Sequence, residues 1–176
     1  IDELKENEFE HLFKTDQLTK SYVKELTIDT DFSLLFPDDY VNNVTERLRL
    51  YTTLNNLKTD KQLTAFEREV IDRFGPLPTA VIDLFDSVKM KWIGMQFGLE
   101  KILMKQHKMV GYFVPDQSSG FFDSVQFSKI LNYVQNNSKS CTLKEKQTRG
   151  GLRLLLTFSN VKSVQQGLTY LRSIAS

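Results

Sequence analysis

The sequence has 176 residues, of which 40% are hydrophobic and 26% charged, so it is neither a disordered chain nor a membrane-embedded one. That length allows a hydrophobic core without support from disulfides or metals. The single cysteine, Cys141, excludes an internal disulfide and favours a reducing, cytoplasmic compartment. No apolar run reaches the length of a membrane span and no signal peptide opens the chain, so no membrane contact is expected. The first residue is Ile1, which predicts a piece of a longer protein.

The charge is distributed unevenly along the chain. The net charge is +1, but residues 1–88 carry 18 acidic and 10 basic residues, whereas residues 89–176 carry 4 acidic and 13 basic ones. This asymmetry predicts either an acidic and a basic binding face, or two halves that pair with each other within the fold.

The chain opens with a polar, acid-rich stretch, residues 1–21, which predicts a linker. From Tyr22 onward, alternation and β-branched residues predict a strand that ends near Phe36 and Pro37. Asn43 and Glu46 then have the spacing of a capping box and predict the start of a first helix. Its apolar residues recur at helical intervals: Val44, Leu48, Tyr51 and Leu54.

Two more helices are predicted before residue 98. Thr59 and Gln62 repeat the capping spacing, and Gly75 followed by Pro76 predicts the end of the second helix. Its buried stripe is expected at Leu63, Phe66, Val70 and Phe74. Pro78 suits the first turn of the third helix, and Gly98 its end. The core face of this helix is expected at Val81, Leu84, Phe85, Val88, Trp92 and Met95. The short connections predict three antiparallel helices.

The second half predicts two hairpins and two further helices. Strands are expected at 101–106 and 109–115 around a turn at His107-Lys108, and at 141–147 and 152–158 around residues 149–151. One helix is expected between the hairpins, with apolar residues Val125, Phe127, Ile130, Leu131 and Val134, and another from about Val161. The predicted fold is α+β in the order β-ααα-ββ-α-ββ-α, with a mostly antiparallel sheet partly covered by helices. The strand order does not follow from the sequence.

The residue patterns contain no catalytic constellation. A phosphate-binding loop and a dinucleotide-binding turn are both absent, and Gly150 and Gly151 fall in the second hairpin turn. His11 and His107 have no partner at metal-ligand spacing. We therefore expect a domain without enzymatic activity, cofactor or metal.

Basic residues concentrate on the two predicted hairpins and beside the first. They are Lys89, Lys91, Lys101, Lys105 and Lys108 around the first hairpin, and Lys139, Lys144, Lys146, Arg149 and Arg153 on the second. Such patches can neutralise phosphates, which makes a DNA-contacting accessory domain one hypothesis. A solvated strand face explains the same pattern, because aromatic residues are not interleaved with the bases.

Three segments carry a resemblance to a known family. They are residues 69–78 (EVIDRFGPLP), residues 37–41 (PDDYV) and residues 46–51 (ERLRLY). Together and in this order they closely resemble the C-terminal domain of bacterial transcription-repair coupling factors, over roughly residues 22–105. On this basis residues 22–176 are expected to form the regulatory domain, and residues 1–21 the linker from the preceding motor domain.

The resemblance implies a parent protein that is an ATP-dependent translocase on duplex DNA. That parent displaces stalled RNA polymerase and recruits UvrA for excision repair in the bacterial cytoplasm. ATP and magnesium belong to its motor domains, so this chain is expected to hold no cofactor. The C-terminal domain of the family acts as a clamp on a module resembling UvrB, which covers the UvrA-binding surface and restrains the motor. The isolated domain is expected to be monomeric.

Glu69 and Asp72 are the candidate partner-binding residues. They lie three positions apart, hence side by side on the second helix, and away from its apolar stripe, so both carboxylates should be exposed. They could accept charge-assisted hydrogen bonds from arginines of the partner module. Alternatively, they solvate the helix or pair locally with the bases Lys61, Arg68 or Arg73. The resemblance favours the partner-binding interpretation.

Overall fold

The computed structural model describes residues 22–115 and 119–176, so the linker predicted for residues 1–21 lies outside the described residues. The elements in chain order are β1 (Thr27–Thr30), α2 (Val44–Asn56), α3 (Asp60–Phe74), α4 (Thr79–Gln96), β2 (Leu99–Lys105), β3 (Lys108–Phe113), the 3-10 helix η1 (Gly120–Asp123), α5 (Val125–Asn136), β4 (Cys141–Thr148), β5 (Gly151–Ser159) and α6 (Val164–Ala175). This order confirms the predicted α+β class. No helix within the described ranges is both long and apolar enough to cross a membrane.

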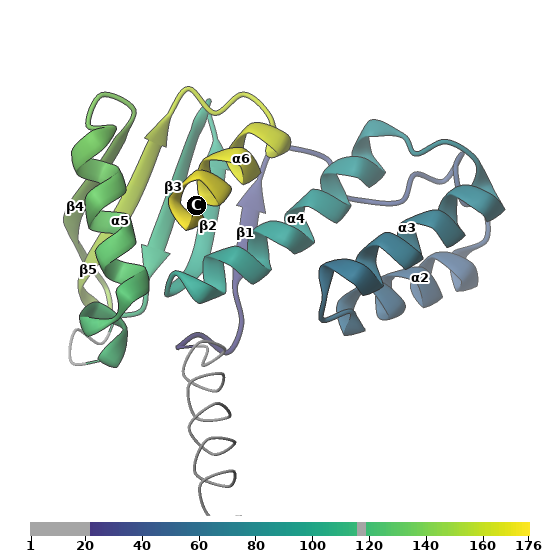
Figure 1. Ribbon diagram of the computed structural model, residues 1–176. Helices are drawn as coiled ribbons and strands as arrows, with labels where there is room; N and C mark the ends of the chain where they lie inside the picture. The colour runs from purple at the N-terminus through teal and green to yellow at the C-terminus, as the bar shows by residue number, and fades with distance from the viewer. Residues whose placement is uncertain (1–21, 116–118) are drawn as a thin grey trace, which may run out of the picture.

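The five strands form one mixed sheet in the order β1-β2-β3-β5-β4. All neighbouring pairs are antiparallel except β1 and β2, which are parallel. Figure 1 shows α4, α5 and α6 on one face of the sheet, with α2 and α3 set to the side, beyond the edge of the sheet. The molecule therefore consists of a sheet half and a helical half that α4 joins.

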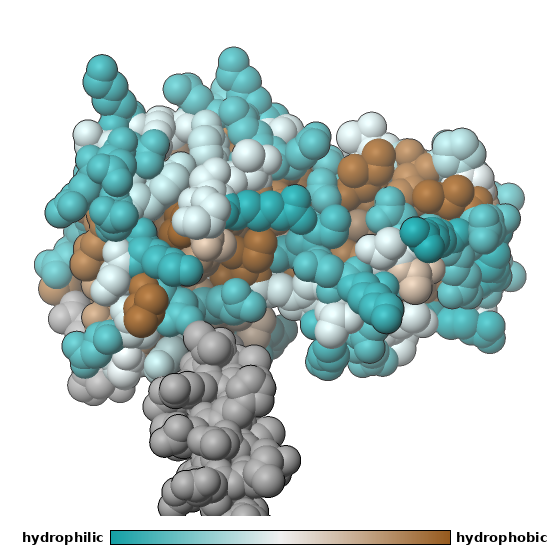
Figure 2. All heavy atoms as spheres, in the orientation of Figure 1, coloured by the Kyte–Doolittle hydropathy of each residue, from teal (hydrophilic) through white to brown (hydrophobic). Residues whose placement is uncertain are grey.

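Each half has its own cluster of buried side chains. The cluster of the helical half contains Phe36, Val41, Leu50, Leu54, Leu63, Phe66, Val70, Val81 and Phe85. Helix α4 supplies Val81 and Phe85 to this cluster and Met90 to the cluster of the sheet half, which the C-cap residue Phe97 also joins. The predicted core face of α4 therefore packs on the helical half from Val81 as far as Trp92, whereas Met95 packs against the cluster of the sheet half. On the face seen in Figure 2, hydrophilic side chains predominate, with apolar patches over both halves.

Helix α3 begins and ends where the sequence predicts. The Thr59 hydroxyl accepts a hydrogen bond from the backbone N–H of Gln62 at 3.1 Å. At the other end Gly75 has a φ of +93°, and its N–H donates to the Ile71 carbonyl at 2.8 Å. Pro76 cannot continue the helix, so the chain turns here towards α4.

The first strand is much shorter than predicted. We expected a strand from Tyr22 to about Phe36, but β1 covers only Thr27–Thr30. The Thr30 hydroxyl accepts the N–H of Phe32 at 3.2 Å, which ends the strand. The chain then leaves the sheet half, and Phe36 is buried in the cluster of the helical half. The apolar residues that follow β1 thus pack first against the cluster of the sheet half and then, at Phe36, in the cluster of the helical half.

Two helices bury a different row of residues from the one predicted. In α2, Val44 and Leu48 are 60% and 61% exposed, and the core is reached by Leu50 and Leu54. In α5, Val125 is 70% exposed and Leu131 is exposed as well. Both helices offer more apolar positions than one stripe can hold, and tertiary packing selects among them. In α3 the predicted stripe is confirmed, with Phe74 only partly buried.

The second hairpin turns within the predicted residues 149–151, although Gly151 already belongs to β5, whereas the turn of the first hairpin is displaced by one residue. Thr148 pairs with Gly151, which leaves Arg149 and Gly150 as a two-residue turn. In the first hairpin Lys105 pairs with Lys108, so the turn is Gln106-His107. Both of these residues have positive φ, 54° and 62°, which is the pattern of a type I′ turn. The usual Asn-Gly signal is missing there, which is why the predicted position was wrong.

Candidate functional site

The predicted site residues Glu69 and Asp72 lie on the exposed side of α3. Both side chains are exposed, as expected from their position opposite the stripe of Leu63, Phe66 and Val70. None of the six ion pairs found among the described residues uses Glu69 or Asp72. The two carboxylates therefore remain available to groups outside the described part of the chain.

The adjacent base on α3 is engaged elsewhere. Arg73 Nη1 lies 2.6 Å from the Glu46 carboxylate on α2, and its guanidinium lies 4.8 Å from the centroid of the Phe74 ring. Arg49 approaches the same Glu46 carboxylate at 4.0 Å. Local pairing of Glu69 or Asp72 with Arg73, one of the predicted alternatives, is therefore not found. The Glu46–Arg73 contact between helices was not predicted, because nothing in the sequence places these two residues together.

An open groove of about 460 Å³ runs between α2 and α3, and Glu69 lies on its wall. Its lining residues are Thr53, Asn56, Leu57, Gln62, Ala65, Phe66 and Glu69. The polar groups of this lining can form hydrogen bonds, and Glu69 contributes a negative charge. The groove can therefore receive a basic or polar segment, but it presents no pair of groups for acid–base or nucleophilic chemistry. Thr53 and Asn56 were missed at the sequence level because helical spacing alone does not say which face of α2 meets α3.

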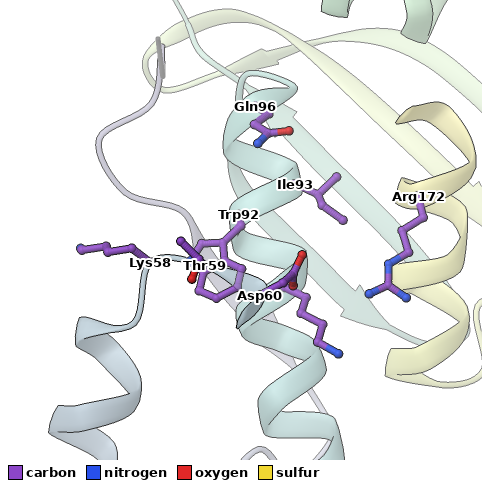
Figure 3. A pocket seen from close by; sticks show the side chains of 8 residues that line it. Lys58, Thr59, Asp60, Trp92, Ile93, Gln96 and Arg172 are labelled. Carbon is purple, nitrogen blue, oxygen red and sulfur yellow. The ribbon is translucent and has the colours of Figure 1, made fainter. Parts of the chain in front are cut away.

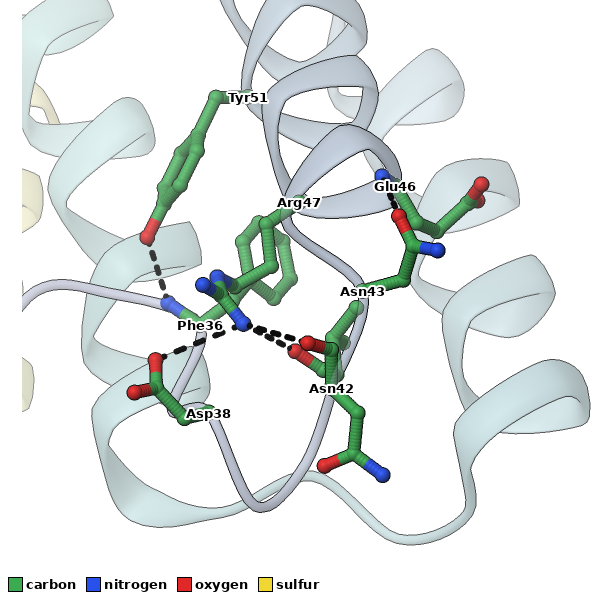
Figure 4. A network of polar contacts seen from close by, with 8 residues as sticks. Phe36, Asp38, Asn42, Asn43, Glu46, Arg47 and Tyr51 are labelled. Carbon is green, nitrogen blue, oxygen red and sulfur yellow. Dashed lines mark hydrogen bonds and ion pairs between the residues drawn. The ribbon is translucent and has the colours of Figure 1, made fainter.

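The segments that carry the family resemblance lie together at the start of α2 (Figure 4). Arg47 Nη1 donates to the Val41 carbonyl at 2.6 Å and lies 3.5 Å from Asp38. The Tyr51 hydroxyl accepts the N–H of Phe36 at 2.8 Å.

The third segment joins the same contact region. The Tyr40 hydroxyl donates to the Gly75 carbonyl at 2.6 Å, which connects residues 37–41 to the end of α3. These contacts fix the path of the chain into α2 and the turn after α3. The three segments thus support the surface that holds Glu69 and Asp72.

A second pocket, of about 310 Å³, lies where α4 meets α6 and the α2–α3 connection (Figure 3). Trp92 and Ile93 of α4 line it, and Arg172 of α6 points towards them. Lys89 at its edge lies 4.0 Å from Asp86. Burial raises the pKa of Asp86, and the positive charges of Lys89 and Arg172 partly oppose this effect. Cationic side chains and an indole ring share the lining of this pocket, but the lining contains no nucleophile with an adjacent base.

The residues considered for metal or thiol chemistry are dispersed. In the described part of the chain, no group of three or more His, Cys, Asp or Glu side chains could hold a metal ion. His107 is exposed in the β2–β3 turn, and His11 lies outside the described residues. Cys141 is buried at the start of β4, and burial raises the pKa of its thiol from 9.0 to about 12.

This burial predicts both low reactivity and a pH-dependent stability. Native Cys141 should resist alkylation near neutral pH and react only on unfolding.

Below pH 9 the Cys141 thiol is protonated in both the folded and the unfolded state, so its contribution to stability is complete. Above pH 9 only the unfolded thiol ionises, so this contribution falls by about 1.4 kcal/mol per pH unit until about pH 12. Urea unfolding across this range should show a steeper loss for the wild type than for Cys141→Ala. Parallel curves would contradict the assignment.

Comparison with known proteins identifies the family. The family model described as the TRCF domain matches residues 30–123, which is more than half of the chain. The chain belongs to the TRCF domain family. The match begins at residue 30, later than the residue 22 that the sequence segments indicated, and it continues past residue 105 but ends before α5. The second hairpin and α6 therefore lie outside the matched region.

Several relatives of this TRCF domain bear the name transcription-repair-coupling factor. The protein of Rickettsia bellii is 34% identical over 133 residues, covering 76% of this chain and 11% of the relative. That of Rickettsia prowazekii is 26% identical over 163 residues, covering 93% and 14%. That of Escherichia coli is 34% identical over 68 residues, covering 39% and 6%. The chain thus spans about a tenth of the length of these relatives.

A solved structure has the same fold. It is described as the crystal structure of the C-terminal domain of a transcription-repair coupling factor, and it superposes with a TM-score of 0.64 at 15% sequence identity. The similarity covers 89% of this chain and 94% of that structure. The described architecture, including the second hairpin and α6, is therefore the fold of a TRCF C-terminal domain.

Proposed function

We propose that this TRCF domain is a non-catalytic regulatory clamp within a larger coupling factor. The parent would be an ATP-dependent DNA translocase that displaces stalled RNA polymerase and recruits UvrA, with ATP and magnesium bound by its motor domains. The domain would bind the UvrB-like module of the same protein, cover the UvrA-binding surface and restrain the motor. One observation carries this proposal: Glu69 and Asp72 are exposed and without ion-pair partners among the described residues, while the neighbouring Arg73 is held by Glu46.

The geometry suits an interface that has to open. The Glu46–Arg73 contact and the hydrogen bond from Tyr40 to Gly75 hold α3 in place before any partner arrives. Little conformational entropy is then lost at this surface on binding. Exposed ion pairs contribute only about 0–1 kcal/mol each, so the groove between α2 and α3 must add shape complementarity. Such a contact is specific and can still be released.

Charge reversal of both carboxylates tests the proposal. In a pull-down or calorimetric titration of this chain against the UvrB-like module of its own parent, Glu69→Lys with Asp72→Lys should weaken binding roughly tenfold or more, because attraction to arginines becomes repulsion. In the full-length parent, the same change should raise the affinity for UvrA. The matched control is Glu25→Lys with Asp31→Lys, which changes the net charge equally at exposed positions beside β1. This control should retain binding.

Two results would count against the clamp. The first is unchanged binding of the module by the α3 double variant while circular dichroism shows a folded chain. The second is an affinity for UvrA that stays at the repressed level in the full-length variant. If the α3 variant and the β1 control lost the same affinity for the module, Glu69 and Asp72 would not be specific contacts.

A further inference from the structure

One face of the sheet carries no helix in the described part of the chain. Figure 1 shows α4, α5 and α6 together on the opposite face. The strand residues that face these helices are buried in the cluster of the sheet half: Ile102, Met104, Met109, Phe113, Leu156 and Phe158. Successive side chains of a strand point to opposite faces, so the alternate residues line the helix-free face. We call this the open sheet face.

The strand register gathers basic residues on the open sheet face. Directly paired residues point to the same side of a sheet, so pairing defines rows across it. One row runs Lys101, Tyr112, Leu155, Lys144 across β2, β3, β5 and β4. A neighbouring row on β4 and β5 pairs Lys146 with Arg153. Beside the β2–β3 turn, Lys105 pairs with Lys108 on the same face. Six basic side chains from four strands are thus brought to one face, although the sequence separates them by up to about 50 positions.

Only part of this charge is balanced. Asp29 on β1 lies 3.1 Å from Lys105, and Glu100 pairs with Arg153. The other four lysines of the face, Lys101, Lys108, Lys144 and Lys146, form no ion pair with the described residues. The whole chain has a net charge of only +1. The positive charge of this face is therefore local and does not reflect an excess of basic residues over the whole chain.

The centre of the open sheet face offers an aromatic ring and aliphatic groups. The Lys101 ammonium lies 5.4 Å from the centroid of the Tyr112 ring, and Leu155, the next residue in the row, is buried with 8% of its surface exposed. Leu103 and Val110, which pair with each other in the adjacent row, are partly buried. A phosphate that draws the Lys101 ammonium away would leave the Tyr112 ring free to stack on a base. Lysines around a partly exposed aromatic ring are a combination that binds single-stranded nucleic acid.

We propose that the open sheet face binds single-stranded nucleic acid, with phosphates held by Lys101, Lys144 and Lys146 and a base stacked on Tyr112. A duplex fits less well because its bases are stacked on each other and cannot reach the ring. In the described ranges, moreover, no helix rises from this face to enter a groove. The site is separate from the clamp surface on α3, and it does not depend on the proposed clamp function.

Fluorescence anisotropy with a short, labelled single-stranded oligothymidylate and this chain tests the proposal. Binding should weaken linearly on a log–log plot against salt, with a slope of about −2 to −3 if three or four phosphates are neutralised. Lys101→Glu with Lys144→Glu should reduce affinity by about tenfold or more. Tyr112→Ala should reduce it by about tenfold, whereas Tyr112→Phe, which keeps the ring, should retain it.

Controls separate a specific site from general electrostatics. Lys61→Glu with Lys129→Glu makes the same charge change at exposed positions on α3 and α5, and should change affinity less than about threefold. Binding of the UvrB-like module should be unaffected by the sheet variants, so this test and that of the clamp can fail independently.

Four outcomes would overturn the proposal. One is the absence of binding at low salt. Another is equal losses for the sheet pair and the control pair. Competition by duplex DNA as effective as by single strands would also overturn it, and so would displacement of the oligonucleotide by polyglutamate of matched charge.

Discussion

Replacing Phe36 by alanine is expected to lower the free energy of unfolding by about 3–5 kcal/mol. Phe36 is 2% exposed in the cluster of the helical half, and its ring lies 5.1 Å from that of Tyr51 and 6.1 Å from that of Phe85. These neighbours come from α2 and α4, so the cavity left by the ring cannot be filled by moving one element. The loss of unfolding free energy should therefore lie at the upper end of the range seen when a large buried residue is replaced by a small one.

Urea unfolding followed by circular dichroism measures this effect, and Leu35→Ala is the matched control. Leu35 is the preceding residue and is 41% exposed, so its truncation should cost less than about 1 kcal/mol. If the two variants lost the same stability, Phe36 would not hold the crossing segment to the helical half. Phe36→Ala should also weaken binding of the UvrB-like module, because α3 rests on the same cluster.

Gly98→Ala is expected to destabilise the chain by about 2–4 kcal/mol, from two sources that add. Gly98 ends α4 with a φ of +72°, a conformation that costs an alanine about 1–2 kcal/mol. An added Cβ would also lie 2.6 Å from the ring of Phe121. Phe121 is fully buried and its ring contacts those of Phe113 and Phe127, so it cannot move aside cheaply.

Gly75→Ala separates the two sources. Gly75 has a φ of +93°, but a Cβ there would meet nothing within 4 Å. This variant should therefore lose only a backbone contribution, about 1–3 kcal/mol, because φ +93° with ψ −170° lies in a region that almost only glycine occupies. Thermal or urea unfolding compares the two variants, and a larger loss at Gly98 is attributed to the collision with Phe121. Equal losses at Gly75 and Gly98 would show that the aromatic cluster adapts, contrary to our expectation.

The features predicted well from the sequence are those that a few adjacent residues determine. The hydroxyl of Thr59 and the positive φ of Gly75 set the two ends of α3 through local hydrogen bonds and backbone geometry. The Arg149-Gly150 turn follows from local chemistry as well. The exposure of Glu69 and Asp72 followed from helical spacing alone, and it is confirmed; their role as partner contacts stays a prediction.

The features missed depend on contacts between distant segments. Helix α2 has two apolar rows, and Leu50 is chosen over Leu48 because the helix packs on Phe36 and α3. The parallel pairing of β1 with β2 brings Ile28 beside Ile102, more than 70 positions later in the sequence. The open sheet face could not be predicted for the same reason. The sequence does show the lysines, but only the strand order places Tyr112 between Lys101 and Lys144.

Helix α4 has a mechanical consequence for the two surfaces. It is 18 residues long, or about 27 Å, and it runs without interruption from one core into the other. A flexible linker would let the two halves move separately. Because α4 is packed in both clusters, a displacement of the helical half would instead turn the sheet half with it. A partner that pulls on Glu69 and Asp72 would therefore tilt the sheet as a rigid body. The helical half and the sheet half would then move together, so the orientation of the open sheet face would depend on whether a partner is bound at α3.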